Sequence, residues 1–275
     1  MTSSPPAPSS PAGIRFTDRV IVLGRNGSGK SVLINYLASL YRCQVVLFDT
    51  KDEFTVPGVD PVHSLERVDW QQPIIHLIDD TGDLDDVDRL FRTALARKTG
   101  RDPSKRYGLV IVAHELADLC ADTPGGTPPA VNAYIRKGRA HGLGLLAGSQ
   151  RPRNIPRAAR TEAQHVFAFA GGFDPEDLPI VAKMLAMSLP DCERALEQAA
   201  SLSPTGEHSY IWRDDRARTT VVRPPLPERL IDRSLASGLD PSTHSKSAGV
   251  QSQEDGRDGG SRIEASRGAG ETAST

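Results

Sequence analysis

GRNGSGKS, residues 24–31, follows the apolar run RVIVL and precedes a stretch with leucines at helical spacing. It satisfies the pattern G-x-x-x-x-G-K-[ST], and a strand before it with a helix after it is the context that this pattern requires. Gly24, Gly27 and Gly29 permit a tight curl in which successive backbone N–H groups and the start of the helix face one anion. The stretch therefore predicts a phosphate-binding loop between a strand and a helix.

The individual residues of this loop have predictable roles. Lys30 is expected to reach the β- and γ-phosphates of ATP, and Ser31 is expected to offer its hydroxyl to a Mg²⁺ ion. The whole predicted nucleotide-binding set is Gly24, Arg25, Asn26, Gly27, Ser28, Gly29, Lys30 and Ser31. The alternative is a glycine-rich turn that only caps the following helix.

The rest of the chain alternates strand-like and helix-like segments. Nearly continuous apolar runs, as expected of strands covered on both faces, occupy 19–24, 44–49, 108–113 and 143–148, with further candidates at 73–78 and 165–170. Helical spacing marks 31–41, 86–98 and 174–200, and a closing hairpin is predicted from 209–213 and 219–223. This alternation predicts an α/β fold with a mainly parallel sheet flanked by helices.

Composition narrows the class of protein. The 275-residue chain has a formal net charge of −2, which argues neither for nor against a nucleic-acid partner. Residues 1–12 and 233–275 lack hydrophobic periodicity, so we expect disordered tails around one domain at 13–232. Cys43, Cys120 and Cys192 have no paired spacing, which predicts neither a disulfide framework nor a zinc site. With no apolar run of about 20 residues and no signal pattern, we expect a cytoplasmic protein without a membrane anchor.

Acidic residues that would complete a hydrolytic site follow three of the predicted strands. Nucleotide hydrolysis needs a carboxylate near the metal and a base that orients water. LVIVAHE places Glu115 as the catalytic glutamate, with His114 where an aspartate is expected. Asp49, and Asp79 with Asp80, keep an alternative open. Asp79 and Asp80 also suit an acidic cap before a turn, and Glu115 also suits a solvated acid in the first turn of a helix.

A basic stretch lies further along the chain. Residues 131–160 contain no Asp or Glu and seven basic side chains, which are Arg136, Lys137, Arg139, Arg151, Arg153, Arg157 and Arg160. Such a strip beside a nucleotide site suits DNA phosphates or the γ-phosphate of a neighbouring subunit. A plain solvated face is the alternative.

The order of these motifs resembles the FtsK–HerA superfamily of ring-forming DNA pumps, which are P-loop NTPases of the RecA/ASCE-like type. Asp49, Lys51 and Glu53 match the Asp-x-Lys-x-Glu phrase that ends the second strand in that family, and SQRP at 149–152 matches the phrase that ends the fourth. The resemblance covers residues 13–224.

The resemblance implies roles for two further residues. Gln150 is implied to be the polar sensor that reports hydrolysis, and its strand is expected beside the phosphate loop; a buried glutamine that satisfies loop backbone is the alternative. Arg139 follows a predicted helix that begins near Pro129. It is implied to complete the active site of an adjacent subunit, and Arg136, one helical turn away, is the alternative.

The leading hypothesis is therefore an ATP-driven double-stranded DNA translocase that forms a homo-oligomeric ring and uses ATP and Mg²⁺. The phage DNA packaging or mobile-element transfer type is expected, with portal or transfer proteins as partners, in a bacterial or phage-infected cell. One alternative is a small-molecule or nucleotide kinase with a lid near 121–130. The other is a nucleotide-switched binding protein with little hydrolysis, which His114 favours.

Overall fold

The computed structural model describes residues 13–52, 54, 56, 58–99, 108–120, 126–203 and 208–230. The two predicted tails, 1–12 and 233–275, lie outside these residues, as does Glu53. Within the part that is described, no helix is long and apolar enough to cross a membrane.

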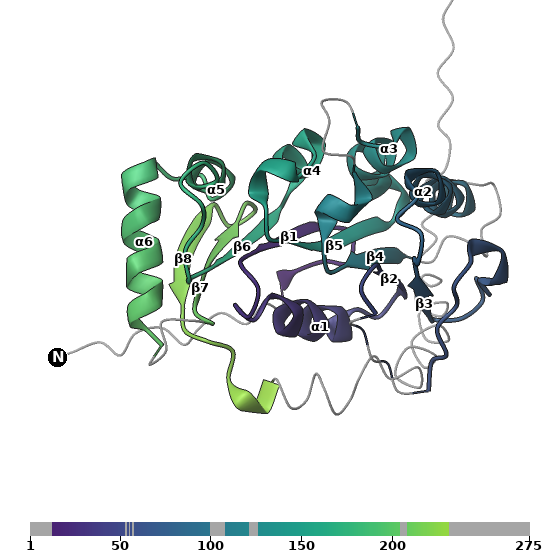
Figure 1. The fold of residues 1–275 in the computed structure, drawn as a ribbon, viewed down its shortest axis with the longest axis horizontal. Coiled ribbons are helices and arrows are strands. Elements are labelled where there is room, and N and C mark those ends of the chain that lie inside the picture. Colours follow the sequence, from purple (N-terminus) through teal and green to yellow (C-terminus); the bar gives the residue numbers. More distant parts are fainter. Residues whose placement is uncertain are drawn as a thin grey trace, which may run out of the picture.

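An eight-stranded sheet in the order β3-β2-β4-β5-β1-β6-β7-β8 forms the centre of the fold (Figure 1). The first six strands in this order pair in parallel: β3 (Ile74–Ile78), β2 (Gln44–Asp49), β4 (Leu109–Ala113), β5 (Leu143–Ser149), β1 (Arg19–Leu23) and β6 (His165–Phe169). The predicted hairpin, β7 (Tyr210–Asp214) and β8 (Thr219–Arg223), adds two antiparallel strands. The predicted mainly parallel α/β fold and all its predicted strands are confirmed.

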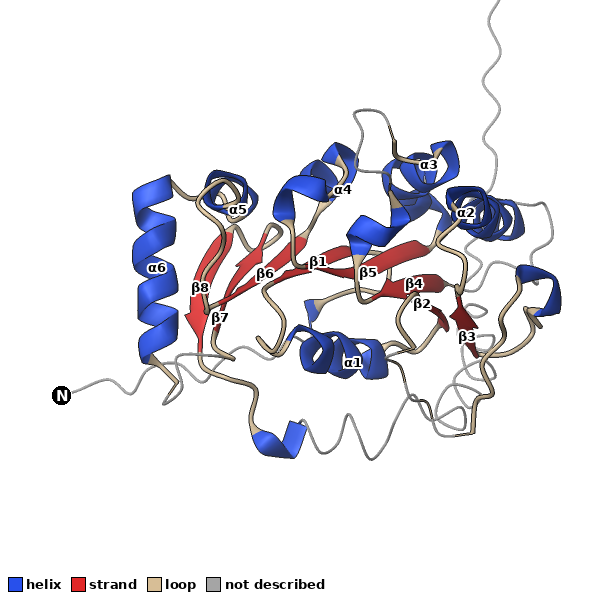
Figure 2. Cartoon of the chain, viewed as in Figure 1, coloured by secondary structure: helices blue, strands red, loops and turns tan. Residues whose placement is uncertain are grey.

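Helices cover both faces of this sheet (Figure 2). On one face lies α1 (Lys30–Leu40), and on the other lie α2 (Leu84–Thr99), α3 (Pro129–Lys137) and α4 (Arg157–Glu162). Two further helices, α5 (Leu178–Met184) and α6 (Leu189–Ser201), lie at the end of the sheet that carries β7 and β8. Short 3-10 helices η2 (Leu65–Arg67), η4 (Leu116–Leu119), η5 (Gly138–His141) and η6 (Pro152–Asn154) fill the connections.

One predicted helix is broken in two. The spacing of apolar residues over 174–200 predicts a single helical segment, but the chain turns between α5 and α6. Ala186 has a left-handed φ of 56°, Ser188 caps α6 by accepting a hydrogen bond from the Asp191 N–H, and Pro190 lies in the first turn. A cap followed by proline starts a new helix rather than continuing an old one.

The six parallel strands are buried on both faces because each contributes to two apolar layers. Along β1, Ile21 and Leu23 pack into the layer beneath α2 and α3, whereas Val20 and Val22 pack into the layer beneath α1. All four side chains are fully buried. Burial of one such aliphatic side chain stabilises the fold by about 2 kcal/mol, so the sheet holds the ends of β1, β4 and β5 in fixed relative positions.

Candidate active site

The glycine-rich loop has the curled form that the sequence predicts. Gly27 and Gly29 have φ of 77° and 97°, which side-chain-bearing residues rarely adopt. Gly29 is the N-cap of α1 and Lys30 is the first residue of that helix. The Lys30 Nζ donates to the Arg25 carbonyl oxygen at 3.3 Å. The loop therefore presents its own backbone and the start of α1 to a single cavity.

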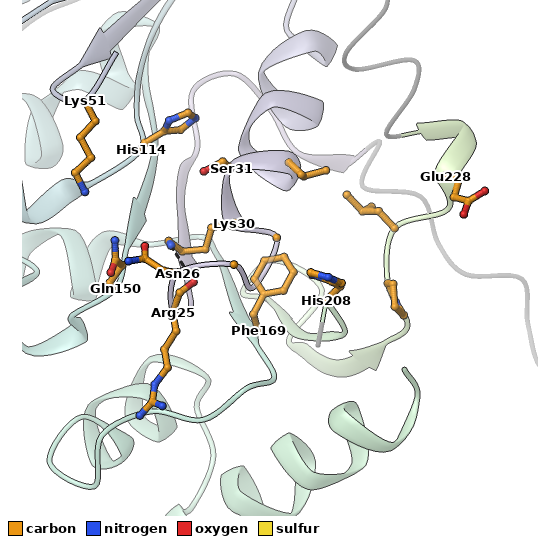
Figure 3. Close-up of a pocket in the computed structure, with 15 residues that line it drawn as sticks. Arg25, Asn26, Lys30, Ser31, Lys51, His114, Gln150, Phe169, His208 and Glu228 are labelled. Carbon is orange, nitrogen blue, oxygen red and sulfur yellow. Dashed lines mark hydrogen bonds between the residues drawn. The ribbon is translucent and has the colours of Figure 1, made fainter. Parts of the chain in front are cut away.

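That cavity has a volume of about 710 Å³ and two chemically different ends (Figure 3). Beside the loop residues, the polar end is lined by Lys30, Ser31, Lys51, His114 and Gln150. The other end is lined by Phe169, His208, Pro225 and Leu226, with Glu228 on its outer side. A polar cationic end joined to an apolar end matches the phosphates and the base of a nucleotide.

The sequence did not identify the apolar end of the cavity. Phe169 ends β6, which pairs with β1 on the side opposite to β5, so knowledge of the strand order would have placed it beside Gly24. His208, Pro225 and Leu226 come from segments on either side of the terminal hairpin, and no motif marks them.

Gln150 lies where the resemblance predicts it. Its strand β5 pairs with β1, and the Gly24 N–H donates to the Ser149 carbonyl oxygen at 3.2 Å. The Gln150 side chain lines the polar end of the cavity.

His114 also reaches the cavity wall, from the end of β4. Its ring stacks on Phe54 with a centroid distance of 3.7 Å, and its Nε2 lies 3.3 Å from the Asn35 Oδ1. These contacts with α1 and with the loop after β2 fix the His114 ring in the cavity wall.

Glu115 lies behind this wall rather than in it. One carboxylate oxygen accepts a hydrogen bond from the Ala117 N–H at 3.4 Å, and the other accepts one from the Gln150 N–H at 3.1 Å. The first contact caps η4, and the second ties the end of β4 to the end of β5. Glu115 is therefore a buried acid that holds Gln150 in position, and it is not the solvated acid that the sequence left as an alternative.

Two of the other acidic candidates, Asp79 and Asp80, do not line the cavity. Asp79 accepts hydrogen bonds from the Thr81 and Gly82 N–H groups at 3.0 and 3.1 Å, and Asp80 pairs with His63 at 2.7 Å. Both follow β3, an edge strand that β2, β4 and β5 separate from β1. The acidic-cap interpretation is confirmed for Asp79, whereas Asp80 pairs with His63 instead.

Asp49 is also used within the fold. Its carboxylate accepts from the Lys51 and Phe54 N–H groups at 3.1 and 2.9 Å, and it lies 3.2 Å from the His76 Nε2. The Asp49 side chain is 1% exposed. It shapes the loop after β2 instead of lining the cavity.

Part of the basic strip is neutralised by acids from a distant segment. Asp174 pairs with Arg25 at 3.1 Å and with Arg151 at 3.5 Å. Arg153 pairs with Glu176 and, at 3.4 Å, with Asp177. The positive strip predicted from residues 131–160 is therefore partly neutralised at Arg151 and Arg153, because acids that follow β6 pair with them.

Arg139 lies at the opposite end of β5 from Gln150. It is exposed on η5, directly after α3. The buried Arg19 supports this corner, since its guanidinium donates to the Tyr134 and Ile135 carbonyl oxygens at 3.0 and 2.9 Å. Burial lowers the pKa of Arg19 from its usual value. At about 3.3 Å per strand residue, the length of β5 places Arg139 roughly 20 Å from the phosphate end of the cavity.

The donor set of the cavity suits phosphates better than a protein-held metal. Mg²⁺ in proteins is bound through one or two carboxylates together with waters and substrate phosphates. Ser31 offers a hydroxyl, but among the described residues no carboxylate lines the polar end. No group of three potential metal ligands of the His, Cys, Asp or Glu type occurs among the described side chains either. Among the described residues that line the polar end, the predicted Mg²⁺ ligand Ser31 is therefore not joined by a carboxylate.

Gly148 lies near the end of β5, close to the backbone at the end of β4. Its lack of a side chain permits this close approach. A Cβ at Gly148 would lie 2.3 Å from the His114 carbonyl oxygen and 2.9 Å from the Ile34 Cδ1. We expect Gly148→Ala to cost about 2 kcal/mol of stability, because backbone atoms must move to relieve the overlap. Thermal unfolding followed by circular dichroism should show a melting temperature about 4–8 °C lower. Gly13→Ala is the matched control, since nothing lies within 4 Å of its added carbon; equal melting temperatures for both variants would contradict the prediction.

Comparison with known proteins gives structural matches. No family model and no curated protein matches this sequence. The structure resembles the genome packaging NTPase B204 from Sulfolobus turreted icosahedral virus 2 in complex with ATP-γS, with a TM-score of 0.59 at 19% identity, covering 78% of this chain and all of that chain (100%). The complex of the same NTPase with AMP gives a TM-score of 0.58 at 20% identity, with coverages of 78% and 100%.

A secretion ATPase has a similar fold. The cytoplasmic domain of the type VII secretion ATPase EccC from Thermomonospora curvata matches with a TM-score of 0.52 at 19% identity, covering 81% of this chain and 28% of that chain. At these identities the likeness establishes the fold. The chain shares the mainly parallel α/β fold of these two proteins, which is the fold that the resemblance of its motifs predicted.

Proposed function

We propose that this chain is an ATP-hydrolysing motor that moves double-stranded DNA and works as a ring of identical subunits. The observation that carries the proposal is the two-ended cavity, in which the phosphate loop and the end of β5 meet. The packaging NTPase and the secretion ATPase named above have the same fold, which supports a motor. Phage DNA packaging or mobile-element transfer, with portal or transfer proteins as partners, is the setting we propose.

We assign each part of ATP hydrolysis to particular residues around the cavity. The loop N–H groups, the start of α1 and Lys30 bind the phosphates. The Gln150 side chain lies in the cavity wall, where its amide can hold the attacking water or contact the γ-phosphate. Glu115 fixes the backbone of Gln150 and is the base nearest to that water in our proposal. Arg139 supplies a cation to the site of the adjacent subunit.

Hydrolysis of ATP by the purified chain, measured with and without long duplex DNA, tests this function. We expect turnover that rises at least tenfold when long duplex DNA is added, because DNA aligns neighbouring subunits. Transfer of the γ-phosphate to a small molecule, with no effect of DNA, would favour the kinase alternative. The lid proposed for that kinase lies partly outside the described residues, at 121–125.

A nucleotide-switched binding protein is the second candidate. It is favoured by the engagement of both Glu115 carboxylate oxygens with backbone N–H groups, which leaves the acid out of the cavity wall. Tight ATP binding with negligible turnover, with and without DNA, would identify that function.

Glu115→Gln separates these two candidates. If Glu115 is the base, ATP affinity should stay within about threefold while hydrolysis falls about 10²-fold or more, because the water loses its proton acceptor. Steady-state ATPase assays and equilibrium binding give the two quantities. Asp80→Asn is the matched control, since it makes the same change at a carboxylate that pairs with His63 near the far edge strand. Loss of activity in the control with an active Glu115→Gln would contradict the assignment.

A further inference from the structure

Lys51 is a cation in the cavity wall. It belongs neither to the phosphate loop nor to the residues proposed for hydrolysis. It comes from the loop after β2, where the buried Asp49 carboxylate accepts the N–H groups of Lys51 and Phe54. Phe54 in turn stacks on His114 at the end of β4. These contacts hold the loop against the neighbouring strand end, so that the Lys51 side chain enters the cavity wall.

The Lys51 side chain is directed toward the phosphate end of the cavity. In Figure 3 it extends beside His114, with its ammonium group on the side where Gln150 and Lys30 lie. Lys51 is exposed, and no carboxylate of the described residues pairs with it. Its charge is therefore available to a ligand.

The charges at the polar end of the cavity are all of one sign. Lys30, Lys51 and Arg25 line it, and the single acid among the described lining residues, Glu228, lies at the other end. Asp174 offsets the charge of Arg25. Lys51 thus adds its charge beside the phosphate loop, where a triphosphate would carry an ionised terminal group near neutral pH because the second pKa of such a phosphate is about 6.

We propose that Lys51 is a second triphosphate-binding cation that contacts the γ-phosphate and supplies charge compensation which P-loop sites commonly obtain from Mg²⁺. The inference rests on the proposed nucleotide binding at this cavity. It explains the absence of a metal-holding carboxylate from the described wall, since an acid beside Lys51 would compete with the phosphate for its charge. The site then binds ATP without an obligatory metal and uses Lys51 to distinguish ATP from ADP.

Calorimetric titration of the full chain with ATP and with ADP, each in Mg²⁺ and in EDTA, tests the proposal. For the wild-type chain we expect the dissociation constants of ATP with and without Mg²⁺ to agree within about threefold. Lys51→Met should weaken metal-free ATP about 20-fold, the worth of one charge-assisted contact, and ADP by less than threefold. Lys51→Arg should recover most of the affinity. Lys183→Met, at an exposed position on α5, is the matched control and should change neither.

A second variant tests the reason for the missing acid. His114→Asp places a carboxylate beside Lys51, so we expect it to weaken metal-free ATP at least fivefold while leaving Mg²⁺-bound ATP unchanged or tighter. Circular dichroism establishes that each variant is folded.

The outcomes separate the two proposals. If the wild-type chain binds ATP with Mg²⁺ but not in EDTA, or if Lys51→Met affects ATP and ADP equally, the role of Lys51 is wrong and nucleotide binding stands. If the wild-type chain binds no nucleotide in either condition, the proposed function and the role of Lys51 are both wrong.

Discussion

Lys30→Ala is expected to reduce ATP hydrolysis at least 10³-fold and to remove measurable ATP binding at micromolar protein. Lys30 is the first residue of α1, and its ammonium group donates to the Arg25 carbonyl oxygen across the glycine-rich loop. The substitution removes both a cation from the phosphate end and a contact that keeps the loop curled. Loss of one preorganised electrostatic contact costs roughly 10²- to 10³-fold in other enzymes, and loss of binding adds to this.

The measurement is a pair of assays on one preparation, steady-state ATPase turnover and binding of a fluorescent ATP analogue. Lys183→Ala removes the same side chain from an exposed position on α5 and should leave both values unchanged. The thermal stability of Lys30→Ala should stay close to that of the wild type, because position 30 begins a helix and alanine is tolerated there. Unchanged turnover in Lys30→Ala would remove the basis for nucleotide hydrolysis at this cavity.

Much of the fold follows from local patterns in the sequence. The six parallel strands appear as short apolar runs because each is buried on both faces, and the phosphate loop appears because its glycines meet a backbone requirement that few other residues satisfy. The positions of Gln150 and His114 could be predicted as well. Each follows a strand end, and parallel strands bring their ends to one edge of the sheet.

Other features depend on contacts between distant segments, so the sequence did not reveal them. The acids that neutralise Arg151 and Arg153 lie more than 20 positions further along the chain, and nothing in the local sequence links them. Glu115 accepts a hydrogen bond from the Gln150 N–H, a group that the pairing of β4 with β5 brings near. The break between α5 and α6 has a different cause, because the helical spacing of apolar residues continues across the Ser188 cap.

Lys51 was predictable from the sequence only in part. The motif that contains it was recognised, but its side chain was given no role, because a lysine after a strand does not by itself indicate which way it points. The Asp49 carboxylate accepts hydrogen bonds from the Lys51 and Phe54 N–H groups and so fixes the backbone of this loop. The place of the Lys51 side chain in the cavity wall is visible only in the folded chain.

Arg139→Ala is expected to spare ATP affinity and oligomer formation while it lowers DNA-stimulated turnover about 10³-fold. Arginines that enter a phosphoryl-transfer site from a neighbouring subunit or partner contribute 10³ to 10⁵ in rate. Arg139 lies at the end of β5 opposite to Gln150, roughly 20 Å away along the strand, which is beyond the reach of an arginine side chain. Any role in catalysis must therefore be exerted in another subunit.

Two variants define the specificity of this effect. Arg42→Ala removes an exposed arginine just after α1 and should leave turnover unchanged. Arg136→Ala tests the neighbouring arginine on α3, which is one helical turn away and also exposed. A loss of turnover in Arg136→Ala with full activity in Arg139→Ala would transfer the role to Arg136.

Mixing experiments test whether the site is shared between subunits. A Lys30→Ala subunit has a defective phosphate loop but an intact Arg139, and an Arg139→Ala subunit has the reverse. Where the two are adjacent, the intact loop of one receives the intact arginine of the other, so an equimolar mixture should recover a measurable part of the wild-type turnover. Turnover per subunit should also rise with protein concentration, since an isolated subunit lacks the arginine of its neighbour. If turnover per subunit is independent of concentration and no mixture recovers activity, each chain hydrolyses ATP alone, and a single-chain mechanism such as that of a kinase replaces the ring.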